Sequence, residues 1–351
     1  MTGPMDIAGR PVGSDAAPYI VAELSGNHNG DPDRALDIIR AVARSGADAV
    51  KIQTYTAETI TIDHDGPEFT VNTGGLWDGR SLYDLYDEAH TPWEWHKAMF
   101  DCAADAGVAI FSAPFDHSAV DFLETLDCPA YKIASFEIVD LPLITKTAAT
   151  GKPLIISTGM ASIGEIREAV ETARAAGASD IALLHCVSGY PTPASDCHLA
   201  TIPHLANELD VQVGLSDHTL GTAVPVAAIA LGATIIEKHV TLRRSDGGPD
   251  AAFSLEPDEL TQMVEACRTT SEALGEVNYQ RKPSEEKNTV FRRSVYVVAD
   301  INAGEIFQPH HIRSIRPGFG IAPKHIGEVI GKAAAQDLKR GTALRWEMIA
   351  D

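Results

Sequence analysis

Basic residues are scarce in this sequence. The chain has 28 Lys and Arg against 49 Asp and Glu, which gives a formal net charge of −21 at pH 7. Nucleic acids and anionic membrane surfaces are themselves negative, so they repel such a protein. The composition therefore argues against nucleic-acid and membrane partners. It also means that an anionic substrate would need a local basic pocket within a repulsive field.

Paired cysteine motifs and long apolar runs are also missing. The five cysteines show no CxxC spacing, and three of them lie in or next to apolar runs, which is typical of reduced thiols. No apolar run reaches the roughly 18 residues of a membrane span, and the N-terminus lacks the apolar segment of a signal peptide. We therefore predict a cytoplasmic protein without a membrane span.

The rest of the composition is that of an ordinary globular protein. Its 351 residues are 44% hydrophobic and 22% charged, and this length suits one large domain with a small one. Short apolar stretches, typical of parallel strands buried on both faces, recur along most of the chain. They lie at residues 19–24, 49–54, 109–112, 131–134, 154–158, 181–186, 211–215 and 234–237.

Helical patterns lie between these stretches, and several end at a Gly stop signal. They cover residues 32–44, 92–106, 163–176 and 222–231, with a last one at 256–274. Eight strand–helix units in roughly 260 residues match a (β/α)8 TIM barrel, which we predict for residues 1–275. A doubly wound parallel sheet is the alternative, but it usually has fewer strands and a Gly-rich first turn that is absent here.

Four segments do not fit the strand–helix repeat. Residues 5–15 are too short for a domain, and we expect a cap beneath the first strand. Residues 56–91 form a long loop with four Gly and several aromatics, and we expect it to be functional at the barrel mouth. Residues 276–290 are polar and predict a linker. The module at 291–351 has about 60 residues, which is marginal for a separate fold, so it should dock on its own barrel or on a partner's.

Residues 211–241 form a strand, a crossover helix and a second strand. A Ser-Asp-His triplet ends the first strand at His218, and a Glu-Lys-His triplet ends the second at His239. Chemistry in parallel α/β folds lies at the C-terminal strand ends, so the two imidazoles could converge on one ion. Because side chains alternate along a strand, Lys238 should point away and be structural. Two hydrogen-bonded histidines without a metal are the alternative.

The other strand ends carry lysines, hydroxyls and carboxylates. Two lysines with a ring of hydroxyls describe a site for phosphate or carboxylate, because hydroxyls donate hydrogen bonds and Lys supplies point charge. Carboxylates suit polyhydroxyl ligands or proton transfer. His28, between two Asn, should fix its loop rather than bind a ligand. The strand-end residues are Glu23, Lys51, Gln53, Tyr55, Ser112, Lys132, Ser135, Glu137, Ser157, Thr158, Ser188, Tyr190, Ser216, Glu237 and Asp250.

Several long motifs of the chain resemble those of sialic acid synthases. The resemblance covers residues 17–351, and the C-terminal segment with IRPGFG resembles the antifreeze-like (SAF) domain of that family, a small β-clip fold. Within the family, LWDGRSLYDLYDEAHTPWEWH and APFDHSAVDFLETLDCPAYKIASFEIVDLPLI look most like pseudaminic acid synthases. The shared motifs are IVAELSGNHNGD, VKIQTYTAETIT, PAYKIASFEI, KPLIISTGM, LLHCVSGYPTP, VGLSDHTLG, IIEKHVT and GGPDAAFSLEP.

This resemblance implies a metal-dependent transferase that condenses phosphoenolpyruvate with an amino-sugar aldehyde. The products would be a nine-carbon 2-keto sugar acid and phosphate, and the sugar would be 2,4-diacetamido-2,4,6-trideoxy-L-altrose. Synthesis of N-acetylneuraminate or legionaminate, with the same chemistry on another sugar, is the alternative. A non-catalytic carbohydrate-binding or scaffold protein on a degenerate barrel is a second one, but such a barrel should have lost some polar strand-end residues.

The family's residue roles carry over to the matching positions. His218 and His239 would hold a divalent ion that polarises the aldehyde oxygen, with Mn²⁺ favoured over Mg²⁺ or Co²⁺. Glu23 would act on the metal-bound water that attacks C2 or protonate the sugar oxygen. Phosphoenolpyruvate would bind to Lys51, Lys132, Ser135, Ser157, Ser188 and Ser216. The sugar would be lined by Gln53, Tyr55, Glu137, Tyr190 and Asp250, and by Arg316 from the neighbouring subunit of a domain-swapped homodimer.

Two positions depart from the family's pattern. Ala113 stands where several sialic acid synthases have Thr, and Ser188 stands where some have Asn. One phosphate donor is therefore expected to be missing, or to be supplied by Ser112.

Overall fold

The computed structural model describes residue 3 and residues 5–350. Contacts divide the chain into two compact units, Met1–Gly275 and Glu276–Asp351, and each is described by itself. All five cysteines are free thiols. Within the described residues, no helix combines the length and apolar character needed to cross a membrane.

Eight parallel strands of the first unit close into a barrel in the order β10-β3-β4-β5-β6-β7-β8-β9. Consecutive strands are neighbours, and β10 closes the ring by pairing with both β9 and β3. This closure confirms the predicted TIM barrel and rules out a doubly wound sheet. The strands are β3 (Tyr19–Glu23), β4 (Ala49–Thr54), β5 (Ala109–Pro114), β6 (Tyr131–Ile133), β7 (Leu154–Ser157), β8 (Ile181–Cys186), β9 (Gln212–Asp217) and β10 (Ile235–His239).

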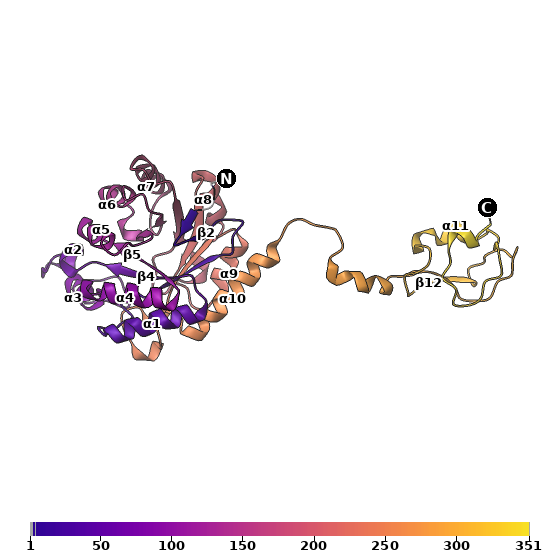
Figure 1. Ribbon diagram of the computed structural model, residues 1–351, viewed down its shortest axis with the longest axis horizontal. Coiled ribbons are helices and arrows are strands. Elements are labelled where there is room, and N and C mark those ends of the chain that lie inside the picture. Colours follow the sequence, from indigo (N-terminus) through magenta and orange to yellow (C-terminus); the bar gives the residue numbers. More distant parts are fainter. Residues whose placement is uncertain (1–2, 4, 351) are drawn as a thin grey trace. The chain divides into compact units, whose positions relative to one another are not determined.

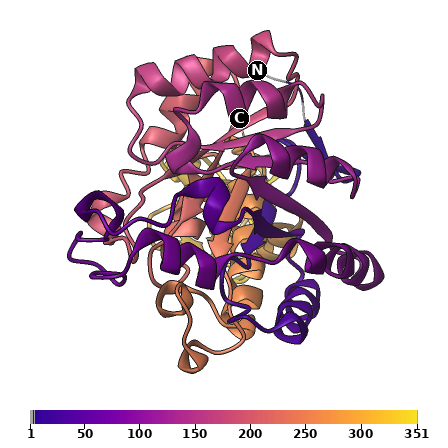
Figure 2. The same cartoon turned by 90° about the vertical axis from the view of Figure 1, so that its left-hand side faces the viewer.

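Helices surround these strands on the outside of the barrel (Figure 1 and Figure 2). Their ends follow local chemistry: the side chain of Asp31 caps the first helix, and Gly46 ends it in the left-handed conformation. The five predicted helices are present within one or two residues of their expected bounds. The outer layer consists of α1 (Pro32–Ser45), α4 (Trp93–Ala106), α5 (His117–Glu124), α6 (Leu141–Ala148), α7 (Ile163–Ala175), α8 (Thr201–Leu209), α9 (Ala223–Ala230) and α10 (Pro257–Leu274).

The N-terminal residues form a short hairpin that belongs to the main core. Strands β1 (Met5–Ile7) and β2 (Arg10–Val12) pair antiparallel, and Met5, Ile7 and Val12 are buried in the same hydrophobic cluster as the barrel strands. Arg10 forms an ion pair with the buried Asp48, which precedes β4. The expected cap is therefore a hairpin that is fixed to the barrel by both apolar and charged contacts.

The long connection between β4 and α4 has more structure than a plain loop. It contains α2 (Ala57–Ile60), a 3-10 turn η1 (Pro67–Phe69) and α3 (Leu82–Ala89). Between them, Thr70 and Ser81 form an antiparallel bridge. The prediction of a loop was wrong for these helical parts, because short helices of four to eight residues leave a weak periodic signal in a sequence.

The second unit has a small hydrophobic core of its own, which includes Val295, Phe307, Val329 and Leu344. Its strands pair antiparallel. Residues 276–290 were predicted as a linker, but a 3-10 helix occupies their second half, because Pro283 provides a helix start and Glu285 caps it. The elements are η6 (Pro283–Phe291), β11 (Ser294–Val297), β12 (Ile312–Ile315), η7 (Pro323–His325), α11 (Ile326–Val329) and η8 (Trp346–Met348).

Candidate functional site

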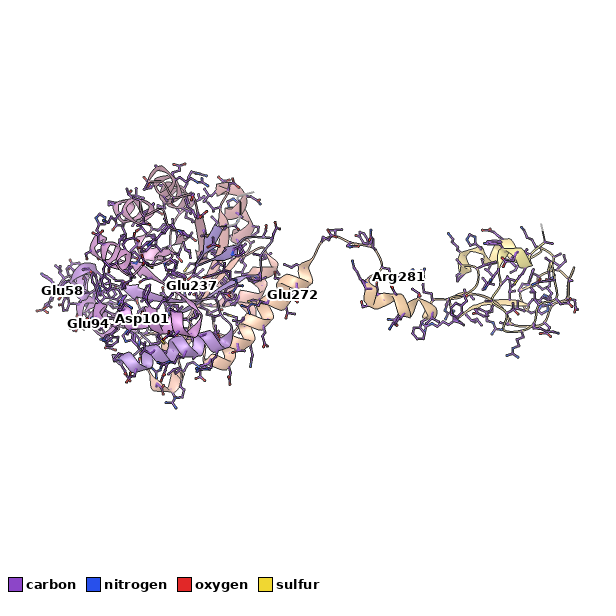
Figure 3. All side chains as sticks on the ribbon, viewed as in Figure 1. Glu58, Glu94, Asp101, Glu237, Glu272 and Arg281 are labelled. Atoms are coloured by element: carbon purple, nitrogen blue, oxygen red, sulfur yellow. The ribbon has the colours of Figure 1, made fainter. Side chains whose placement is uncertain are left out.

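Four charged side chains from four strands meet inside the barrel. Lys51 Nζ lies 2.7 Å from Glu23 Oε2 and 3.6 Å from Glu237 Oε1. Lys132 Nζ lies 3.1 Å from the same Glu237 oxygen. All four are buried, and Figure 3 shows Glu237 within the barrel, away from surface carboxylates such as Glu58 and Glu94. Buried charges are stable only when they are paired in this way.

The two carboxylates of this group differ in proton affinity. Burial raises the pKa of Glu23, and the nearby Glu237 adds to the effect against the opposing charge of Lys51. Burial also opposes the ionisation of Glu237, but the ammonium groups of Lys132 and Lys51 outweigh it and lower the pKa. Such a split marks one carboxyl as the proton carrier and the other as a fixed anion. Here burial favours the protonated form of Glu23, and the two lysines favour the anion of Glu237.

Serine hydroxyls from neighbouring strand ends lie beside the lysines. Ser216 donates to Glu237 Oε1 over 3.2 Å, and Ser135 accepts the N–H of Gly159 at 3.2 Å. A Cβ atom at Gly159 would lie only 2.3 Å from Ser188 Oγ, so that position has to be glycine. The buried Ser157 hydroxyl has no partner. The structure thus brings together the predicted hydroxyls around β6, β7 and β8.

Ser112 lies outside this set, contrary to its expected place at the barrel mouth. Its hydroxyl is 2.6 Å from Thr54 Oγ1, which in turn bonds with His96 of α4 at 2.8 Å. It therefore faces the helical layer. Ala113 is the register partner of Gln53 and so shares its inward face. Ser112 cannot replace the donor that Ala113 lacks, because successive side chains of a strand face opposite sides.

Several residues predicted for the sugar side form one hydrogen-bonded chain. Gln53 donates to Glu23 Oε1 at 2.8 Å and to Ser25 Oγ at 3.1 Å. Ser25 donates to Asp250 Oδ2 at 2.5 Å, and burial raises the pKa of Asp250. Tyr55 has another role in this structure, since its ring packs against aromatic side chains of α3 and of the loop after β5.

The imidazoles of His218 and His239 face each other with ring centroids 5.4 Å apart. His218 Nδ1 lies 3.0 Å from the carbonyl oxygen of Val187, which orients the ring and leaves its other nitrogen for a ligand. Burial, followed by the charge of His218, holds the pKa of His239 well below its usual range. Its buried Nδ1 has no hydrogen-bond partner, and the nearest carboxylate oxygen, of Asp250, is 3.8 Å away.

This pair fits a divalent ion as an open site. The neutral imidazole of His239 offers the lone pair that a metal requires, and its orphaned buried nitrogen calls for a partner. Burial opposes the charge of His218, but the neighbouring Cys186 raises its pKa, so this ring has to release its proton when it binds a metal. Among the described residues, no group of three or more His, Cys, Asp or Glu side chains is placed to hold a metal. The protein would therefore supply two nitrogens and leave the other positions to water or substrate oxygens, which is typical of a catalytic rather than a structural site.

Aromatic rings enclose the two histidines. Tyr190 lies 4.4 Å from the His218 ring, and Phe253 lies 5.0 Å from the His239 ring. Outside them, Trp77 from the connection between β4 and α4 lies 5.5 Å from Tyr190. This aromatic group gives the histidine side of the site an apolar wall.

Two other predicted sugar residues stand apart from the central contacts. Glu137, at the end of the 3-10 turn η2 (Ser135–Glu137), has a buried oxygen without a partner, and burial raises its pKa to about 7. Arg316 belongs to the second unit and is exposed there.

The residues expected to be structural have that role. Lys238 forms a buried ion pair with Asp217 and donates to the Thr219 carbonyl oxygen at 2.6 Å, on the opposite face from the histidines. His28 Nδ1 accepts the N–H of Gly30 at 3.1 Å and so fixes its own loop. Both predictions are confirmed.

Sequence reasoning assigned no site position to three residues that the structure places here: Ser25, Cys186 and Trp77. Glu237 was expected at its strand end but was given no role in binding or catalysis. Ser25 follows Glu23 by two positions, so strand alternation alone could have placed it. Cys186 Sγ lies 3.9 Å from both Ser188 Oγ and His218 Nδ1. Trp77 had no such signal, because it sits within an irregular segment.

Most of the chain matches known protein families and known proteins. The model of the NeuB family matches residues 38–279, and that of the SAF domain matches residues 292–350. The pseudaminic acid synthase of Campylobacter jejuni is 44% identical over 332 residues, 95% of this chain and 96% of that protein. The N,N'-diacetyllegionaminic acid synthase of Legionella pneumophila is 35% identical over 347 residues, 97% of each chain.

A solved structure is also similar. The N-acetylneuraminic acid synthetase of Leptospira borgpetersenii, in complex with citrate, is 30% identical with a TM-score of 0.73, and the match covers 82% of this chain and 95% of that one. Together with the family models, it confirms the predicted barrel with a C-terminal SAF domain.

The raised pKa of Glu137 predicts a pH-dependent effect of Glu137→Gln. The unfolded chain ionises this group near its ordinary value, and the folded chain only near pH 7, so the wild type loses stability as pH rises between the two. Relative to the wild type, the free energy of unfolding of the variant should therefore rise by on the order of 3 kcal/mol between pH 4.5 and pH 8. Urea unfolding followed by circular dichroism measures this, with the exposed Glu171→Gln as control. A difference that stays constant with pH contradicts the assignment.

Proposed function

The chain belongs to the NeuB family, and from this membership we propose that it condenses phosphoenolpyruvate with 2,4-diacetamido-2,4,6-trideoxy-L-altrose. The products are phosphate and a nine-carbon 2-keto sugar acid, so the activity is that of a pseudaminic acid synthase. The 44% identity over 95% of the chain carries this conclusion. Legionaminate or N-acetylneuraminate synthesis, the same reaction on another sugar, is the alternative. This alternative is less well supported, because the identity to the legionaminic acid synthase is only 35%.

Phosphoenolpyruvate binds beside Lys51 and Lys132 in this proposal. Its carboxylate and phosphate need fixed positive charge and neutral donors, which the two ammonium groups and the hydroxyls of Ser135, Ser157 and Ser188 can supply. The ammonium of Lys132 is held in place by Glu237, 3.1 Å away. The buried and partnerless hydroxyl of Ser157 supports the proposal, since an unused buried donor needs an acceptor.

Carbon–carbon bond formation joins C3 of phosphoenolpyruvate to the aldehyde carbon of the sugar. Positive charge then develops at C2, water adds there, and phosphate leaves to give the keto group. The aldehyde oxygen becomes a hydroxyl and needs a proton. Glu23 can donate it, because burial raises the pKa of this carboxyl and so favours its protonated form. Gln53 holds this carboxyl in position through a 2.8 Å hydrogen bond.

His218 and His239 hold a divalent ion in our proposal, Mn²⁺ more readily than Mg²⁺ or Co²⁺, because imidazole is a softer ligand than oxygen. When bound, the ion polarises the aldehyde oxygen of the sugar. The low pKa of His239 keeps that ring neutral and able to bind metal.

A second copy of the chain completes the site in our proposal, as a domain-swapped homodimer. Large apolar side chains at the strand ends of the barrel, Phe136, Met160 and Leu220, are exposed by 59%, 64% and 67%, and such a rim favours a covering surface. Arg316 is exposed on the second unit, and Phe319 near it is 62% exposed. The SAF domain of the partner copy would cover the rim, with Arg316 on an acetamido carbonyl of the sugar.

A panel of sugars tests the proposed reaction. Purified protein with phosphoenolpyruvate should release phosphate with the diacetamido-trideoxy sugar and little with N-acetylmannosamine, as measured by a phosphate assay and by mass spectrometry of the product. Glu23→Gln should reduce turnover by about 10²–10⁴-fold, as expected for the loss of a general acid. The reverse sugar preference refutes the proposed substrate, and no turnover with any sugar favours a binding or scaffold protein.

Metal removal tests the role of the paired histidines. EDTA should abolish phosphate release, and added Mn²⁺ should restore it. Calorimetry of Mn²⁺ with the chelated protein should show binding that His218→Ala and His239→Ala each remove, because either loss leaves a single imidazole. Full activity in excess EDTA, or unchanged Mn²⁺ binding by both variants, contradicts this part of the proposal.

Complementation between two impaired variants, assayed at a sugar concentration far below the KM of Arg316→Ala, tests the dimer. Arg316→Ala should raise the KM for the sugar and leave phosphoenolpyruvate binding nearly intact, whereas His218→Ala should lose turnover. Mixed after brief dissociation, the two proteins should regain part of the activity, because one of the two sites in a mixed dimer has both intact residues. The absence of any recovery, with dimers confirmed by ultracentrifugation, argues that Arg316 does not act across subunits.

A further inference from the structure

We infer that Trp77 selects the sugar, by forming the wall that meets the sugar carbons farthest from the aldehyde. This inference rests on the proposed function and specifies its substrate recognition. Trp77 lies in the connection between β4 and α4, residues 56–91, which none of the reaction steps above uses. The residue is half-buried, whereas the preceding Leu76 is 51% exposed.

The position of Trp77 follows from a row of aromatic contacts. The ring centroid of Tyr190 lies 4.4 Å from that of His218, and the Trp77 ring lies 5.5 Å from that of Tyr190. A sugar whose aldehyde carbon sits at the histidines would extend past Tyr190 toward the indole. Trp77 therefore meets the far end of the sugar rather than its reacting carbon.

The indole is held rigidly at this place. Its N–H donates to the carbonyl oxygen of Pro249 at 3.1 Å, and Pro249 directly precedes Asp250. The carboxylate of Asp78 accepts the N–H groups of Thr73, Gly74 and Gly75 at 2.8 to 3.2 Å. These bonds close the loop on itself next to Trp77, so the ring is presented by a fixed backbone.

The chemistry of this wall favours sugar carbons that present methyl groups instead of hydroxyls. The proposed sugar carries an acetamido group at C4 and a methyl group at C6, where N-acetylmannosamine carries hydroxyls. The single donor of Trp77 already bonds with Pro249, and an indole has no acceptor. A hydroxyl against the ring would lose its water without gaining a partner, whereas a methyl group gains apolar contact.

Substitutions at Trp77 test this inference by changing the ratio between two sugars. In wild type, kcat/KM should favour the diacetamido-trideoxy sugar over N-acetylmannosamine. Trp77→Ala should reduce that preference by about tenfold or more, within the range of apolar-pocket discrimination. Trp77→Phe keeps an aromatic ring but loses the bond to Pro249, so most of the preference should persist. Leu76→Ala, in the same loop but exposed, is the matched control and should leave the ratio unchanged.

A binding measurement makes the test independent of turnover. The open-chain alditols of the two sugars cannot react, and calorimetry with each should show the same loss of preference in Trp77→Ala. Trp77→Gln replaces the ring with a polar group and should also reduce the preference between the two alditols. This variant replaces Trp77→Ala in the test if the alanine variant does not fold. A ratio that is unchanged in the folded variants, or affinities that fall equally for both alditols, overturns the inference.

The outcomes separate this inference from the proposed function. If wild type prefers N-acetylmannosamine or turns over no sugar, the proposed function fails and the inference with it. If wild type discriminates as proposed but Trp77→Ala and Trp77→Gln discriminate equally well, only the role of Trp77 is refuted.

Discussion

The mutual neutralisation of four buried charges is the constraint on which this site depends. Glu23, Lys51, Glu237 and Lys132 come from four different strands and are buried inside the barrel. None of them could be ionised there alone, since an isolated buried charge costs several kcal/mol. Together they form a group of two cations and two carboxylates, one of which readily holds a proton. The barrel thereby keeps two ammonium groups available for an anionic ligand inside a protein whose net charge is −21.

Strand alternation made much of this site predictable. Buried parallel strands are short apolar runs, and the polar residues that end them must lie at the same rim of the barrel. The orientation of Lys238 away from the histidines followed from its odd position between Glu237 and His239. The sequence did not reveal which side chains of β5 face the interior of the barrel. The prediction placed Ser112 at the mouth, but the register of β5 against β4 turns Ala113 inward instead. Nothing in a run as short as AIFSAP fixes that orientation.

Contacts between distant loops were beyond the reach of sequence reasoning for a different reason. Tyr55 has the correct parity for the site, yet its ring packs against Tyr86 and Phe115, because the segment after β4 folds back as α2 and α3. The same folding brings Trp77 to Pro249, 172 residues away in the chain. Such pairings depend on the conformation of irregular backbone, for which hydrophobic periodicity contains no information.

The ion pair of Asp217 and Lys238 has a consequence for the two histidines of the site. These residues are register partners across β9 and β10, and each directly precedes one of the two histidines. Their ion pair therefore links the two strands behind the imidazoles and limits the distance between the two rings. For the ion that we propose between the two histidines, the length of this bridge would set the distance between the imidazoles from the opposite face of the strands.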